Sequence, residues 1–147
     1  MQNQHLSLAL ALLLWSVKQA SALADHEVEE REAALPIALL CAAYSTEIGL
    51  KGILQSQHKA AEGHDLGAMY RQLPQAVQSS ILARGGFSES ELQERLDDFS
   101  TSCAALGSLC RGHGTDIAVT FLQRLAGAVH TELEERIRTA EPGRLAL

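Results

Sequence analysis

The sequence predicts an all-α protein, a four- to five-helix up-and-down bundle, and three observations support this. Leu and Ala, at 24 and 22 residues, far outnumber the β-branched Ile and Val, at 6 and 5, and this balance favours helices. There are only 3 Pro in 147 residues. Apolar residues recur at spacings of three and four in segments with short connections, as in a bundle. We expect one helical domain over residues 1–140 and a loose tail at 141–147.

The first predicted helix runs from about Leu6 to Glu30. Its apolar part, Leu6–Val17, has 12 residues and is too short to span a bilayer. Two interpretations stay open: the first buried helix of the bundle, or the core of a signal peptide cleaved after residues 1–24, at Ala22-Leu23-Ala24. Lys18 follows the run and no Lys or Arg precedes it, which favours a retained helix and no membrane association.

The second and third predicted helices each contain one proline. The second runs over about Pro36–Ala61, because the fixed φ of proline suits the first turn of a helix. The third covers Asp65–Ala83, with Asp65 as its N-cap. Pro74 lies inside this range, so we expect it to restart or kink the helix.

The last two predicted helices have the clearest apolar periodicity. Ser88 and Glu91 form a capping box ahead of the fourth helix. Its stripe continues to Cys110, where Arg111–Gly114 ends it; the fifth helix begins near Thr115 and ends at Glu141. The two stripes consist of Leu92, Leu96, Phe99, Cys103, Leu106 and Cys110, and of Leu122, Leu125, Val129, Leu133 and Ile137.

Charge and cysteine content exclude several classes of function. With 12 basic and 18 acidic residues, a net charge of −6 and 4% aromatics, the chain lacks a broad basic footprint and base-stacking platforms. Three cysteines give no disulfide framework, which favours the reducing cytoplasm. Cys103 and Cys110 are two helical turns apart, roughly 10 Å, so they and His113 are not expected to share a metal. We expect neither a metal nor another cofactor.

Glu47 is the first candidate site residue. It lies between apolar stripes of the second predicted helix, so its carboxylate is expected to be partly buried and to need a partner. Lys51, at i,i+4, is one candidate partner, and Arg111 is the other. The two apolar stripes also predict a homodimer, since a small bundle has little interior with which to cover both.

Arg111-Gly112-His113-Gly114 is the second candidate, because it lies between two helices and directly precedes a helix N-terminus. Arginine binds phosphate bidentately and histidine moves protons near neutral pH. A glycine C-cap with an exposed histidine is the structural alternative. Secondary candidates are His64, next to the capping Asp65, and Arg124 and His130 on the polar side of the last helix.

Two segments together resemble the HEPN family of small helical domains. Ala42–Leu54 (AAYSTEIGLKGIL) is similar to the family helix that carries a Glu and, four residues later, a Lys. Gly63–Pro74 (GHDLGAMYRQLP) is similar to the His-Asp-Leu start of the next helix. An Arg at a helix junction, here Arg111, and a final amphipathic helix follow in the family order. The resemblance covers about residues 33–137.

The resemblance implies a helical bundle that often dimerises. Many members are metal-independent ribonucleases of toxin–antitoxin or phage-defence systems, and others bind nucleotides or are inactive. Active members carry a His four to six residues after the Arg, whereas Thr115, Asp116 and Ile117 stand there in this chain. His113 follows Arg111 by two residues, and Arg124 and His130 have five residues between them.

The expected function is therefore a cytoplasmic HEPN-like protein that acts on or binds RNA or a nucleotide. As a ribonuclease, Arg111 would hold the scissile phosphate, His113 would take the 2′-hydroxyl proton and Glu47 would orient Arg111. An antitoxin or a nucleotidyltransferase would be its partner. The alternative is a non-catalytic helical dimerisation or interaction module, which the acidic net charge and the residues after Arg111 favour.

Overall fold

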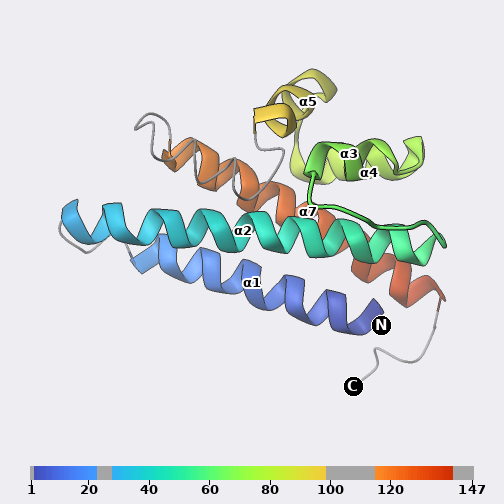
Figure 1. Cartoon of the computed structure of the whole chain (residues 1–147), viewed down its shortest axis with the longest axis horizontal. Coiled ribbons are helices and arrows are strands. Elements are labelled where there is room, and N and C mark those ends of the chain that lie inside the picture. Colours follow the sequence, from blue (N-terminus) through green and yellow to red (C-terminus); the bar gives the residue numbers. More distant parts are fainter. Residues whose placement is uncertain (1, 23–27, 99–114, 141–147) are drawn as a thin grey trace.

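The protein is all-helical in the part of the chain that the computed structural model describes, which is residues 2–22, 28–98 and 115–140. Those residues contain no strand, so the predicted fold class is confirmed (Figure 1). The six helices found there are α1 (Gln2–Ala22), α2 (Val28–Ser56), α3 (Leu66–Arg71), α4 (Gln75–Gly85), α5 (Glu89–Asp98) and α7 (Thr115–Ala140).

α1 and α2 form an antiparallel hairpin that is joined by buried serines. The hydroxyl of Ser45 donates to the carbonyl oxygen of Ala9, and that of Ser16 donates to the carbonyl oxygen of Ala38, each at 2.6 Å. Gln123 of α7 reaches the same Ser16 hydroxyl at 3.0 Å. Leu6–Val17 is therefore helical and packs against α2, as predicted, but only Ala9 and Ser16 in it are buried, so it is not the buried helix that the sequence favoured. Retention of this segment in the mature protein stays a prediction.

The centre of the core lies where α2 crosses α7. A Cβ added to Gly49 would lie 2.6 Å from Cγ1 of Val129, so the absence of a side chain at Gly49 lets the two helices approach closely. α2 and α7 run in the same direction, whereas α1 runs against both (Figure 1). Fully buried large side chains line this contact and the layer above it, namely Leu39, Leu50, Ile53, Leu54, Leu66, Met69, Tyr70, Ile81, Leu92, Leu96, Leu122 and Leu125.

α3 and α4 are separated at Pro74, so this proline restarts the helix, one of the two outcomes expected from the sequence. Asp65 caps α3 as predicted, its Oδ1 accepting from the backbone N–H of Ala68 at 2.9 Å. α4 runs antiparallel to α7, because Ser80 contacts Glu132 whereas Gly85 contacts Arg124. The directions of α1, α2, α4 and α7 therefore alternate, as in an up-and-down bundle.

Several helix bounds differ from the sequence prediction. α1 ends at Ala22 rather than Glu30, and α2 begins at Val28 with Pro36 in its interior. The helix-forming Glu, Arg, Ala and Leu residues before Pro36 outweigh its missing hydrogen bond. α2 ends at Ser56 rather than Ala61, ahead of a positive φ of 57° at His58.

The predicted capping of α5 and the start of α7 agree with the structure. The backbone N–H of Glu91 donates to the hydroxyl of Ser88 at 3.2 Å, and α7 begins at Thr115. The predicted apolar stripe of the fourth helix extends to Cys110, and its part after Asp98 lies outside the described residues. Glu141 and the tail at 141–147 also lie outside them.

Candidate functional site

The carboxylate of Glu47 is buried in α2 and has two partners. The residue is 4% exposed. The Nζ of Lys51, one turn further along α2, donates to Oε1 of Glu47 at 2.8 Å. The Nδ1 of His64 lies 2.7 Å from the same oxygen. The two partners differ in their access to solvent, because the side chain of Lys51 is 21% exposed and that of His64 is 71% exposed.

The segment between α2 and α3 brings His64 to Glu47 by turning back along α2 (Figure 1). The Nζ of Lys59 donates to the carbonyl oxygen of Gln72 at 2.6 Å and ties this segment to the end of α3. Asp65, the α3 N-cap, follows His64 directly. A carboxylate on Nδ1 orients an imidazole and leaves Nε2 for a hydrogen bond or a proton transfer. The cluster of Glu47, Lys51 and His64 could therefore bind a polar group at its exposed edge.

The sequence prediction for Glu47 is resolved in part. Glu47 is buried, and Lys51, one of the two candidate partners, donates to it. From its position beside Asp65, His64 was expected only to belong to the turn that caps the helix. In the structure its ring also contacts Glu47. Arg111 and His113, the predicted catalytic pair, lie outside the described residues, so their relation to Glu47 stays a prediction.

Arg124 does not belong to a free polar face. One of its terminal nitrogens, Nη2, donates to the carbonyl oxygens of Gly85 and Gly86 at 2.6 and 3.2 Å. Its guanidinium lies 4.5 Å from the ring centroid of Phe87. These contacts close the C-terminal end of α4, where Gly86 has a φ of 67°. Arg124 therefore has a structural role that its helix position alone did not indicate.

His130 is half-buried rather than solvated. Its buried Nε2 has no hydrogen-bond partner among the described residues. Glu134, which lies at i,i+4 from His130, accepts from Nη2 of Arg138 at 2.9 Å. In the described part of the chain, no three His, Cys, Asp or Glu side chains lie close enough to hold a metal ion.

Sequence reasoning missed a polar network between α4 and α7. Glu132 is 7% exposed and accepts from the Ser80 hydroxyl at 2.6 Å and from Nε of Arg136 at 3.0 Å. Arg84 lies 3.4 Å from Glu132 and also binds Glu135. The i,i+4 spacing of Glu132 and Arg136 was the available signal, but the same spacing is common on exposed helices.

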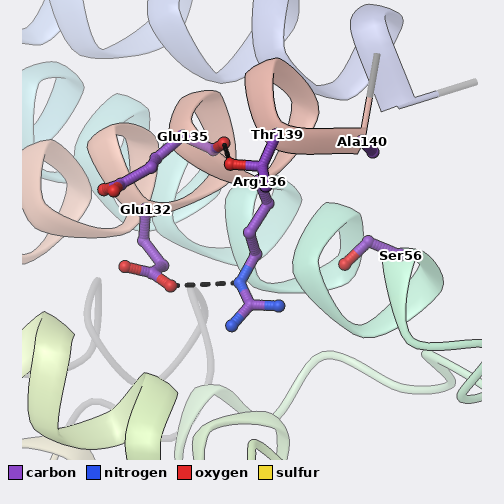
Figure 2. A pocket seen from close by; sticks show the side chains of 6 residues that line it. All are labelled: Ser56, Glu132, Glu135, Arg136, Thr139 and Ala140. Carbon is purple, nitrogen blue, oxygen red and sulfur yellow. Dashed lines mark hydrogen bonds and ion pairs between the residues drawn. The ribbon is translucent and has the colours of Figure 1, made fainter. Parts of the chain in front are cut away.

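This network borders a pocket of about 440 Å³ at the C-terminal ends of α2 and α7 (Figure 2). The lining residues are Ser56, Glu132, Glu135, Arg136, Thr139 and Ala140.

Large apolar side chains remain exposed on the hairpin, on both flanks of α1, and we call these residues together the α1–α2 face. Their exposed fractions lie between 37% and 59%. From Ser7 to Val17, α1 carries no charged residue, although a helix that is apolar all round is normally covered. The exposed residues are Leu8, Leu10, Leu14, Trp15, Val17, Ile37 and Tyr44.

One helical stretch within the described residues, Leu35–Ser56, is long and apolar enough to cross a membrane. It is 67% buried inside the protein, a property that it shares with core helices of soluble bundles. The shorter apolar stretch Leu6–Lys18 lies in α1.

Comparison of the chain with models of protein families, with curated proteins and with solved structures finds no match.

Proposed function

We propose that this protein is a helical self-association module, in which the α1–α2 face of one copy covers the same face of a second copy. One observation carries the proposal: seven large apolar side chains on two adjacent helices are between 37% and 59% exposed. Isolated exposed apolar residues are ordinary on a soluble protein, but a set concentrated on one hairpin is typical of an interface.

The area of the face is in the range that a dimer needs. Seven large side chains, each about half exposed, present on the order of 600 Å² of apolar surface. This total is divided between the two flanks of α1, because Leu8 and Trp15 lie about 200° around the helix from Leu10 and Val17. A standard interface buries about 800 Å² on each partner, so the face with its polar margin is large enough for a stable pair.

The chemistry of the face favours a second copy of this chain as its occupant. In a twofold dimer each patch meets itself and must be self-complementary. The stretch Ser7–Val17 of α1 meets this condition, because it carries no charged residue, whereas Lys18 and Lys51 lie at the margin of the face. The net charge of −6 then lies on the remaining surface, where it opposes further association.

The experiment is sedimentation velocity at about 100 μM, a concentration at which weak dimers are populated. The wild-type chain is compared with Trp15→Glu, which puts a charge in the α1–α2 face. Gln75→Glu adds the same charge at an exposed position of α4 and is the matched control. We expect dimers for the wild type and for Gln75→Glu, and monomers for Trp15→Glu. A monomeric wild type would contradict the proposal.

A second candidate function is that of a cytoplasmic HEPN-like protein acting on RNA or a nucleotide, as a toxin or a phage-defence component with an antitoxin or nucleotidyltransferase partner. The observation that favours it is the convergence of Glu47, Lys51 and His64, the residues on which the family resemblance rests. His64 is open to solvent there. In this proposal Arg111 and His113 act on the phosphate and the 2′-hydroxyl.

Cleavage of a labelled single-stranded RNA in EDTA separates the two functions. The HEPN proposal expects cleavage by the wild type, loss of cleavage in Arg111→Ala, and unchanged cleavage per folded molecule in Arg124→Ala. The reverse order of effects would assign the site to Arg124 and His130. If the protein is only a self-association module, none of the three proteins should cleave the RNA.

A further inference from the structure

The pocket between the ends of α2 and α7 has one strong donor group directed into it. Arg136 is held through Nε by the buried carboxylate of Glu132, at 3.0 Å. Figure 2 shows that the two terminal nitrogens of the guanidinium are not bonded to Glu132, and that one of them extends towards Ser56. A guanidinium fixed at Nε presents these two nitrogens as a fork, which fits the oxygens of a carboxylate or a phosphate.

The nearby carboxylates are already neutralised by arginines. Glu132 is bound by Ser80, Arg84 and Arg136, and Glu135 is bound by Arg84. Two arginines thus face two glutamates in this network, whose net charge is zero. Since the donors directed into the pocket belong to Arg136, the polar group that completes the site is an acceptor, and an anion is the strongest acceptor.

The hydroxyl groups of Ser56 and Thr139 indicate which polar groups the ligand carries besides its anionic group. Ser56 donates its hydroxyl hydrogen to the carbonyl oxygen of Ile53 at 2.5 Å, and Thr139 donates to the carbonyl oxygen of Glu135 at 2.7 Å. Each hydroxyl oxygen therefore has lone pairs left and can accept from a ligand while its own hydrogen stays on the carbonyl oxygen. The matching groups on a ligand are hydroxyl donors.

The size of the pocket excludes a bare ion as its best ligand. Its volume of about 440 Å³ lies in the range of small-molecule sites and far exceeds that of one water, roughly 30 Å³. We propose that this pocket binds a small hydroxyl-bearing oxyanion, such as a sugar phosphate or a sugar acid. Arg136 holds the anionic group, and Ser56 and Thr139 accept from its hydroxyls.

Titration calorimetry on the full chain tests this site with three probes: ribose 5-phosphate, gluconate and inorganic phosphate. Arg136→Gln removes the charged fork, whereas Arg138→Gln removes an equivalent i,i+4 partner of Glu134 on the exposed side of α7. We expect at least one of the two sugar probes to bind more tightly than phosphate, to weaken by about tenfold or more in Arg136→Gln and to be unchanged in Arg138→Gln. The stronger of the two identifies the anionic group.

Thr139→Val tests the hydroxyl contact separately. It should weaken the binding of the sugar probe and leave that of inorganic phosphate unchanged. A thermal melt of each variant verifies that it is folded, and Arg136→Lys, which keeps the charge, should bind at an intermediate level. Absence of binding of both sugar probes at millimolar concentration, or equal binding by wild type and a folded Arg136→Gln, would overturn the proposal.

Discussion

The Nδ1 of His64 and the Oε1 of Glu47 lie 2.7 Å apart although the residues are 17 positions apart in the chain. This contact joins the segment before α3 to the middle of α2. Glu47 is buried whereas the His64 side chain is 71% exposed, so the two residues contribute unequally to stability. The buried carboxylate needs hydrogen-bond partners to offset the cost of its burial, whereas the exposed imidazole can be solvated by water.

Glu47→Ala is therefore expected to be more destabilising than His64→Ala. Loss of Glu47 leaves the amino group of Lys51, only 21% exposed, without its partner and opens space on α2, which together cost about 1–3 kcal/mol. Loss of the exposed His64 should cost less than about 1 kcal/mol. Urea unfolding of the two variants measures both values. Equal losses would mean that His64 is as essential to the cluster as the buried carboxylate.

Gly49→Ala should destabilise the protein because the new Cβ would lie 2.6 Å from Cγ1 of Val129. Overpacking of this kind costs about 1–3 kcal/mol. Gly127→Ala is the control, since nothing lies within 4 Å of a Cβ at this helical position; it should stabilise by up to about 1 kcal/mol.

Val129→Ala in the Gly49→Ala background should restore part of the lost stability by removing the group that clashes. Thermal melts of the two single variants and of the double variant measure this. If Gly49→Ala were as stable as Gly127→Ala, the close approach of α2 and α7 would be refuted.

Arg124→Ala is expected to lower the free energy of unfolding by about 1–2 kcal/mol. The variant loses two hydrogen bonds to backbone carbonyls and the contact with the Phe87 ring. Arg138→Ala, which removes an exposed arginine from the same helix, should change stability by less than about 0.5 kcal/mol. A melt of Arg124→Ala indistinguishable from that of Arg138→Ala would show that the α4 cap contributes nothing.

Tyr70 makes stability depend on alkaline pH. Its burial, and to a lesser degree the charge of Glu89, raise the pKa of the Tyr70 hydroxyl from 10.0 to about 12. Between pH 10 and pH 12 the Tyr70 hydroxyl loses its proton in the unfolded state but keeps it in the folded state. The contribution of Tyr70 to the free energy of unfolding is therefore complete below about pH 10 and is lost as pH rises towards 12. It amounts to at most about 2–3 kcal/mol. Tyr70→Phe should flatten the decline of unfolding free energy from pH 9 to 11, and a decline as steep as in the wild type would refute this assignment.

The ends of the helices could be predicted from the sequence where a capping residue or a proline determines them locally. The cap at Asp65, the acceptance of the Glu91 N–H by the Ser88 hydroxyl, which is one half of the predicted capping box, and the break at Pro74 are local effects, and the structure reproduces them. The start of α2 was not predictable from Pro36, because a proline inside a long helix is tolerated when the residues before it are strong helix formers and the remainder is well packed.

The candidate site was predictable only for pairs that are close in sequence. Glu47 and Lys51 are four residues apart, so their contact follows from helix geometry. The contacts of His64 with Glu47, of Arg124 with Gly85 and of Arg84 with Glu132 depend on how separate helices pack. Periodicity identifies a polar side of a helix, but it does not identify which neighbouring helix approaches that side.

Trp15 reports directly on self-association through the α1–α2 face. It is the one tryptophan in the chain, it belongs to this face and it is 49% exposed. Its emission spectrum is recorded from about 1 to 100 μM, a range typical of weak dimers, together with the molar mass by light scattering. If the α1–α2 face forms the dimer interface, Trp15 becomes buried on association. The emission maximum should then move to shorter wavelength as the mass rises from monomer to dimer. An emission maximum that stays constant across the whole range, whether or not the mass doubles, would contradict it.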